Sequence, residues 1–542
     1  MTLYPAMTYA NKDRSEKIFF LFLIIYFINK CPYILPAGRL WRLSLEETPD
    51  IPTRKADNKA TKLIDLRPFI RPVTAYRMST SSSSPESARF TPAEQRAVIS
   101  LASLYALRML GLFMVLPVMM LEGSKLDGAT PQLLGLAMGV YGLTQAVLQI
   151  PAGTLSDRIG RKPIIIGGLL IFAVGSFIAA SADNVWGVII GRALQGGGAI
   201  ASAIMALVTD LTREDNRMKA MASIGASIGL SFSLALVLGP WLVSLGGLNL
   251  IFAATGVLAV GGVAVTLFVI PTPPARPHRD ATAVWEEVVK QLKNPQLWPL
   301  NAGIFLLHAL MVAIFVGIPA QLLKAGIPAD HHSWLYLPVL AVAFVFMVPF
   351  IIVAEKKRKM KSVVITGAVV IAIGLFGMAA ASKLWHWVIL LLIYFWGFNL
   401  MEASLPSWLS KIAPAGAKGS AMGIYSSMQF LGAFCGGGIG GWVLGHYGSP
   451  TLFVGLGALV ILWALILFRA SAPLHLTSIR LAVNGDCSDF TLAQLMALDG
   501  VSDVSLQSGE GAVYLKVSAS GFDQQQALNI IQSTGEEHGS QR

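Results

Sequence analysis

Residues 153–162 read GTLSDRIGRK, and this short charged stretch decides how the chain around it folds. On either side of it lie apolar stretches of about twenty residues, each long enough as an α-helix to cross a hydrocarbon layer of about 30 Å. The same alternation of charged clusters and apolar stretches runs from residue 95 to residue 470. An all-α bundle of membrane-spanning helices is the expected fold.

The composition of the whole chain agrees with this expectation. Of its 542 residues 54% are hydrophobic and only 13% are charged, which leaves too few ionisable groups to solvate a globular surface. The apolar runs predict about twelve spans. They lie near 97–121, 131–155, 162–183, 185–209, 219–246, 249–270, 299–322, 334–354, 363–382, 385–410, 419–446 and 449–469.

The basic residues are divided unequally between the loops. If the spans alternate in direction, one side receives about seventeen Lys and Arg residues and the other about three, namely Lys125, Lys324 and Lys383. Positively charged loops stay in the cytoplasm, so both termini are expected there. The net charge of +11 is then topological, and nucleic-acid binding is not expected because the charges lie between spans and not on one continuous face.

Residues 1–90 form an N-terminal extension with a different composition. Its apolar run at 18–28 is short for a span, and the basic residues before it are also typical of a signal peptide. The other interpretation takes Met78, which precedes a Ser-rich stretch, as the true start. Residues 1–77 would then be upstream sequence that is not translated in the cell.

The C-terminal residues 471–542 predict a small soluble domain with a βαββα order. The expected elements are strands at 478–483, 501–507 and 512–517 and helices at 490–498 and 522–532, with a hairpin turn at 509–511. This order resembles a ferredoxin-like fold of the kind found in metal-carrier domains, without its last strand. Cys487 stands alone without a CxxC pair, so neither a metal nor a cofactor is expected, and the domain is expected to serve regulation or to bind a ligand or protein partner.

The two halves of the bundle are related by an internal repeat. Seven residues of spans five and six recur 201 positions later in spans eleven and twelve: Ala220, Met221, Gly239, Trp241, Phe252, Gly256 and Leu258 return as Ala421, Met422, Gly440, Trp442, Phe453, Gly457 and Leu459. Parallel repeats are typical of secondary transporters that rock one half against the other around a central site. A duplication without transport would leave the same pattern, so channels and receptors stay open.

Three motifs carry a family resemblance. The 153–162 stretch, RALQGGG at 192–198 and Gly239-Pro240 resemble the loop motif, the fourth-span motif and the antiporter-type fifth-span motif of the major facilitator superfamily. With RMLG at 108–111 and the C-terminal domain, the chain is similar to proton-driven efflux members that carry such a domain. The resemblance covers about 95–470. It implies two six-helix halves at 91–270 and 299–470 joined by a linker at 271–298, a bacterial inner-membrane location and proton antiport.

The loop motif is expected to form a latch. Glycine permits close approach and tight turning, and a carboxylate is favoured near a helix start. In the resembling family such contacts hold the cytoplasmic side closed in the outward-facing state. The alternative is that these charges only set topology, and the second half, with Glu355 and without the glycines, is expected to have a weaker or different latch. The expected latch residues are Gly153, Asp157, Arg158, Gly160, Arg161, Lys162 and Asp210.

Ionisable residues inside the spans mark the expected transport site, because they are costly unless they face the bundle interior or a wet cavity. They stand on spans one, four, seven and ten, which line the central cavity in the resembling family: Arg108, Arg192, His308 and Glu402. Glu402 is the expected proton carrier because burial favours a protonated carboxyl group, with a structural ion pair as the alternative. His308 is the second candidate carrier, against a packing role. Asn399, Gln145 and Gln149 are the expected hydrogen-bonding residues of the cavity.

Two further features complete the expectations. The fifth span carries Gly225, Gly229 and Gly239-Pro240, which allow close packing and a bend or, by resemblance, block a proton leak. The linker 271–298 combines prolines with an amphipathic stretch expected to lie on the membrane surface.

The function expected is export of small molecules coupled to protons. The alternative is a membrane sensor that signals through the C-terminal domain. An enzyme or a primary pump is not expected, because the chain has no GxxxxGK[ST] loop to hold nucleotide phosphates.

Overall fold

The computed structural model describes residues 90–272, 281–414, 417–469, 476–483, 489–507, 512–518 and 521–539. The predictions for the apolar run at 18–28, for Met78, for the 509–511 turn and for Cys487 lie outside these residues.

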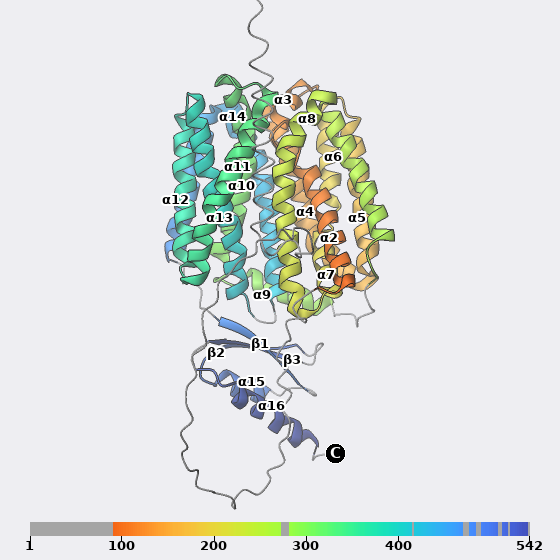
Figure 1. Cartoon of the computed structure of the whole chain (residues 1–542), viewed down its shortest axis with the longest axis vertical. Coiled ribbons are helices and arrows are strands. Elements are labelled where there is room, and N and C mark those ends of the chain that lie inside the picture. The colour runs from red at the N-terminus through yellow and green to blue at the C-terminus, as the bar shows by residue number, and fades with distance from the viewer. Residues whose placement is uncertain are drawn as a thin grey trace, which may run out of the picture. The chain divides into compact units, whose positions relative to one another are not determined.

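The first half consists of long helices that run side by side (Figure 1). Its elements are α2 (Pro92–Phe113), α3 (Met119–Glu122), the 3₁₀ turn η1 (Gly123–Lys125), α4 (Pro131–Ile159), α5 (Arg161–Ala180), α6 (Val185–Gly197), α7 (Ala201–Leu211) and α8 (Glu214–Phe268). The second half follows the linker helix α9 (Ala281–Leu292). It contains α10 (Trp298–Lys324), the 3₁₀ turn η2 (Ala329–His331), α11 (His332–Lys356), α12 (Met360–Ala379), α13 (Leu384–Ile412) and α14 (Lys418–Arg469).

In the described part of the chain ten helical segments are long and apolar enough to cross a membrane. Two of them, α8 with 55 residues and α14 with 52, are too long for a single crossing. Each is broken at glycines with a positive φ, Gly247 at 66° and Gly448 at 79°, which glycine adopts without strain. The two breaks divide these helices where the predicted span pairs meet, so the twelve-span prediction is confirmed.

Two predicted spans are interrupted where a continuous helix was expected. The fourth, predicted over 185–209, leaves the helical conformation at Gly198 between α6 and α7. An alanine Cβ at Gly198 would lie 2.3 Å from the Gly168 carbonyl oxygen of α5, so close packing and the break occur together. The first, predicted to reach residue 121, ends as a regular helix at Phe113 and continues through turns to α3.

Local sequence signals explain where several helices begin. The Thr91 hydroxyl accepts a hydrogen bond from the Glu94 N–H, and the Glu94 carboxylate accepts one from the Thr91 N–H at 2.8 Å, which completes a capping box at α2. Thr130 caps α4 and Asn184 caps α6 in the simpler one-bond form. These caps satisfy amide groups that have no partner within their own helix.

The two halves share one hydrophobic core and meet most closely where α4 contacts α14. Gly135 and Gly437 face each other so closely that a Cβ on Gly437 would lie 2.3 Å from the Gly135 carbonyl oxygen. Farther along the same pair, Gly441 approaches the Pro131 carbonyl and Gly139 the Phe434 carbonyl. Small residues therefore bring the backbones of the two halves together, as in other membrane helix pairs.

The C-terminal domain has the predicted βαββα order. Its elements are β1 (Leu476–Ala482), α15 (Asp489–Met496), β2 (Val501–Gln507), β3 (Ala512–Ser518) and α16 (Gln524–Gly539). The sheet order is β1-β3-β2 with antiparallel pairs, so β1 and β2 run parallel on either side of β3, as in a ferredoxin-like fold. Val513, Leu515 and Val517 of β3 pack with Leu495 of α15 and Ile531 of α16 in a separate core. No fourth strand is present among the described residues of this domain.

Candidate functional site

Arg161 is the centre of the loop motif. Its guanidinium forms an ion pair with Asp157, donates to the Ser156 hydroxyl at 2.7 Å, and donates through Nε to Asp210 Oδ2 at 3.2 Å. Gly160, with φ at 99°, makes the tight turn that places Arg161 at the start of α5. One side chain thus joins the end of α4, the start of α5 and the end of α7.

The other predicted latch residues lie around this contact. Arg158 is exposed and Lys162 is half-buried, and the bond from Arg161 to Asp210 is formed as predicted. A Cβ at Gly153 would lie 3.2 Å from the Ser202 hydroxyl of α7, so this glycine packs closely as expected. The contacts of Arg161 all lie within the first half.

The second half has a corresponding contact with the charges exchanged. Glu355, at the end of α11, accepts hydrogen bonds from the Lys411 ammonium at 2.6 Å and from the Ser407 hydroxyl at 2.7 Å, both on α13. In the first half the loop provides the cation and the fourth span the carboxylate. In the second half the loop end provides the carboxylate and the tenth span the cation.

Arg108 lies inside the first half and is only 2% exposed. It donates through Nη2 to Gln145 Oε1, and the Gln145 amide donates in turn to Gln149 Oε1 at 3.0 Å. The Arg108 guanidinium also lies 5.8 Å from the centre of the Tyr141 ring. Its Nε and Nη1 atoms are buried without a hydrogen-bond partner.

Arg192 is fully buried between α6 and α4. It donates to the backbone carbonyls of Ala137 at 3.3 Å and Met138 at 3.4 Å and to Gln195 Oε1 at 2.9 Å. Its guanidinium lies 5.1 Å from the centre of the Tyr141 ring. Arg192 therefore bonds to the backbone of a neighbouring helix within its own half.

A second polar cluster lies in the other half. His308 Nε2 is 2.7 Å from the Gln429 amide nitrogen, and His308 Nδ1 is 3.9 Å from Glu402 Oε2. Both His308 Nδ1 and Glu402 Oε2 are buried without a hydrogen-bond partner, and so is the hydroxyl of Tyr425. Asn399, one turn before Glu402, is half-buried. The structure thus brings His308 and Glu402 together from α10 and α13.

The fifth-span motif has one close contact. A Cβ at Gly239 would lie 2.4 Å from the Met114 carbonyl oxygen of the first span, so α8 packs tightly there, next to Pro240. The expectation for Gly225 and Gly229 was wrong, because nothing lies within 4 Å of a Cβ at either position. In the fifth span the close contact is therefore made at Gly239, and Gly225 and Gly229 do not extend it.

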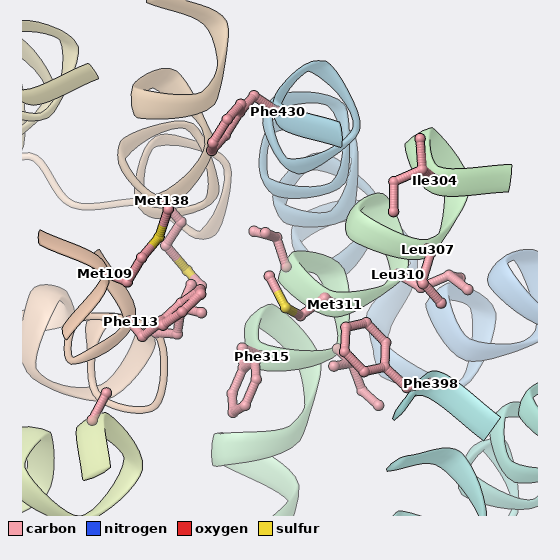
Figure 2. Packing of buried hydrophobic residues seen from close by; sticks show 14 of the residues in the cluster. Met109, Phe113, Met138, Ile304, Leu307, Leu310, Met311, Phe315, Phe398 and Phe430 are labelled. Carbon is pink, nitrogen blue, oxygen red and sulfur yellow. The ribbon is translucent and has the colours of Figure 1, made fainter. Parts of the chain in front are cut away.

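Apolar side chains of the two halves face each other in the core. Figure 2 shows Met109, Phe113 and Met138 of the first half opposite Met311 and Phe315 of the second. Methionine and phenylalanine adapt to many shapes and contribute large apolar surfaces. A wall of this composition suits an apolar part of a bound molecule.

Sequence reasoning missed two residues of this arrangement. Tyr141 lies within cation–π distance of both Arg108 and Arg192, and a single tyrosine in an apolar span gave no sequence signal. Glu94 is 5% exposed and bonds to Arg213, 119 positions later. Its T-x-x-E spacing with Thr91 is typical of a helix start and gives no indication of this partner.

Comparisons with known proteins agree with this architecture. The sequence pattern of the Major Facilitator Superfamily matches residues 101–436 and 361–484. The Escherichia coli K12 protein described as inner membrane transport protein YajR is 45% identical over 437 residues, which is 80% of this chain and 96% of that protein. The multidrug resistance protein MdtH of Aeromonas salmonicida is 26% identical over 63% of this chain and 87% of its own length.

Solved structures show the same fold at low sequence identity. A bacterial homologue of the human lysosomal transporter Spinster, in an inward-facing and occupied conformation, aligns with a TM-score of 0.60 at 13% identity, covering 71% of this chain and 98% of its own. The D-xylose–proton symporter aligns with a TM-score of 0.57 at 18% identity, covering 69% and 98%. This chain is a multi-pass membrane transporter and not an enzyme, and it belongs to the Major Facilitator Superfamily.

Proposed function

We propose that this protein is a proton-coupled antiporter that exports small molecules by alternating access. The observation that carries the proposal is the pair of unpartnered atoms, His308 Nδ1 and Glu402 Oε2, 3.9 Å apart inside the bundle. Glu402 Oε2 is buried without a hydrogen-bond donor, while the Glu402 side chain as a whole is 40% exposed, so this carboxyl group lies where a proton can be both taken up and released. A group whose charge depends on what binds beside it is suited to proton exchange.

The partner of His308 sets which ring nitrogen carries the proton. If the Gln429 amide donates to Nε2, a neutral His308 carries its proton on Nδ1, the atom nearer Glu402. The distance of 3.9 Å is too long for a hydrogen bond, and a small rotation of either side chain would form one. Glu402 is therefore the proposed proton carrier, with His308 as its neighbour and the second candidate.

The contacts between the halves support alternating access. The α4–α14 glycine contact near Pro131 and Gly441 lies at the end of the bundle away from the basic loops. With the basic loops in the cytoplasm, this contact closes the outer side, and the Arg161–Asp210 latch lies at the inner side. Opening outward then requires α4 and α14 to separate. Because the Arg161 contacts in this structure lie within the first half, the latch would hold the inner side closed only after the two halves approach each other there.

The remaining parts of the proposal concern location and partners. The charge asymmetry and the relative described as an inner membrane transport protein support a bacterial inner-membrane location with both termini in the cytoplasm. The relatives described as multidrug resistance proteins support small molecules as the exported class. The C-terminal domain, which has its own core, is proposed to bind a ligand or a protein partner.

Two measurements test proton coupling at Glu402. Infrared difference spectra of the purified protein between acidic and alkaline buffer should contain a carboxyl band that Glu402→Gln removes and Glu286→Gln, on the exposed side of α9, retains. In proteoliposomes with an internal pH dye, a gradient of a small molecule that raises the Tm of the purified protein should move protons through the unmodified protein and not through Glu402→Gln. A proton flux that survives in Glu402→Gln but not in His308→Asn would assign the proton to His308, and a flux that survives in both variants would contradict proton coupling at this pair.

A further inference from the structure

The first half contains two buried arginines and no carboxylate to balance them. Every Asp and Glu between residues 91 and 270 stands at the end of a span or in a loop: Glu94, Glu122, Asp127, Asp157, Asp183, Asp210, Glu214 and Asp215. Arg108 and Arg192 are 2% and 0% exposed, and neither has an ion pair among the described residues. A buried cation without a counter-charge is costly, so something must compensate each one.

The two arginines differ in how far the protein itself compensates them. Arg192 uses all three of its nitrogen positions, with two backbone carbonyls and Gln195 as acceptors. Arg108 uses only Nη2, toward Gln145, and leaves Nε and Nη1 buried without an acceptor. Of the two buried arginines, Arg108 is therefore the one that lacks hydrogen-bond acceptors.

A second unused donor lies beside Arg108. Tyr141 is 2% exposed, and its hydroxyl is buried without a partner. Its ring lies within cation–π distance of both guanidinium groups and 6.4 Å from the ring of Phe430 on α14. Tyr141 therefore stands at the wall where the first half meets the second, with Met138 of the same helix facing the second half (Figure 2).

We propose that Arg108 and Tyr141 form a subsite for the anionic group of an organic substrate, with a carboxylate as the class that fits. The guanidinium offers two free N–H positions and the phenol one O–H, which matches the acceptor capacity of a carboxylate. The methionine and phenylalanine side chains between the halves would accommodate the apolar remainder. This inference rests on the proposed function for its transport meaning, but binding itself does not require proton coupling.

The binding test uses benzoate, with benzamide as its neutral counterpart, on the full-length protein in detergent at constant ionic strength. A ligand that binds the folded state raises the apparent Tm by an amount that grows with the logarithm of the ratio of ligand concentration to Kd. Benzoate is expected to raise Tm and benzamide to leave it unchanged. Arg108→Gln should weaken benzoate binding about tenfold or more, and Tyr141→Phe, which removes only the hydroxyl, about threefold to tenfold.

Control variants separate this subsite from general charge effects and from proton coupling. Lys324→Gln removes one exposed positive charge at the end of α10 and should leave the benzoate response unchanged. Glu402→Gln should also retain it, so a failure of proton coupling would not affect the result. If Arg108→Gln does not fold, Tyr141→Phe still tests the subsite, because it removes only one hydroxyl group.

Three results would overturn the proposal. The first is an equal response to benzoate and benzamide. The second is a benzoate response that survives both Arg108→Gln and Tyr141→Phe. The third is a chloride response that equals that of benzoate and depends on Arg108, because it would assign the site to an inorganic anion.

Discussion

The Glu94 carboxylate accepts hydrogen bonds from both the backbone and the side chain of Arg213. Glu94 Oε1 accepts from the Arg213 N–H at 2.8 Å and from Nε at 3.1 Å, and Oε2 accepts from Nη2 at 3.1 Å and from the Asn216 amide at 3.3 Å. The first turn of α2 is thereby tied to the turn between α7 and α8. Asp210, three residues before Arg213, is held from the other direction by Arg161.

Replacing this carboxylate should destabilise the first half. Glu94→Gln keeps the size but turns one acceptor oxygen into a donor that faces other donors, and we expect a loss of about 1–3 kcal/mol. The Arg213 side chain is 46% exposed, so solvent screening places the loss toward the lower end of this range. The measurement is the apparent Tm in detergent, with the exposed Glu286→Gln as control. Equal Tm values for the two variants would contradict a structural role for Glu94.

The bond between Arg161 and Asp210 should appear as an energetic coupling. Arg161→Gln and Asp210→Asn each remove one partner, and the double variant should be less damaging than the sum of the two by about 0.5–3 kcal/mol. Thermal unfolding of the four proteins measures the coupling. The same cycle with Lys324→Gln in place of Asp210→Asn should be additive. If the losses in stability are additive in both cycles, the Arg161–Asp210 bond contributes no energy, and the 153–162 loop would only set the topology.

Adjacent glycines of α14 offer a matched test of the contact between the halves. A Cβ at Gly437 would lie 2.3 Å from a backbone oxygen of α4, whereas nothing lies within 4 Å of a Cβ at Gly438. Gly437→Ala should destabilise the protein by about 1–3 kcal/mol through overpacking. Gly438→Ala should be neutral or stabilising by up to about 1 kcal/mol, because alanine favours the helix. A larger loss at Gly438 than at Gly437 would show that α4 and α14 are not in this contact.

The exchanged charges in the second half predict a rescue. Glu355→Lys and Lys411→Glu each bring like charges together, and the double variant should restore the attraction and with it the apparent Tm. Their side chains are 43% and 23% exposed, so each single change should cost only about 1 kcal/mol or less. The contact would contribute nothing to stability if Glu355→Lys and Lys411→Glu each leave Tm unchanged. The same conclusion would follow if the double variant has a Tm no higher than that of the less stable single variant.

Much of the fold could be predicted because its determinants are local. Apolar runs and charged loops predicted the number of spans, and the change of pattern after residue 469 predicted the order of the small domain. The breaks after Phe113 and at Gly198 escaped prediction, because both segments are as apolar as a continuous span. The packing of neighbouring helices decides there whether the backbone continues.

The sequence predicted which residues belong to the candidate site, but it did not predict which of them are in contact. Arg108, His308 and Glu402 stand out in any apolar span because a charge there is costly. That Arg108 keeps two nitrogens unused, or that His308 faces Glu402 at 3.9 Å, depends on the rotation of each helix about its axis. Tyr141 illustrates the limit, since its importance arises entirely from two arginines on other helices.

The sequence by itself determined that this chain spans a membrane in two related halves with a small domain after them, because hydropathy, charge and repeat spacing are properties of the chain in one dimension. Only the tertiary structure decided which polar groups meet, as with Glu94 and Arg213, and which glycines touch, as with Gly437 and not Gly438. Helices that are apolar on every side carry no pattern that fixes which face meets a neighbour, so these contacts are settled by side-chain packing.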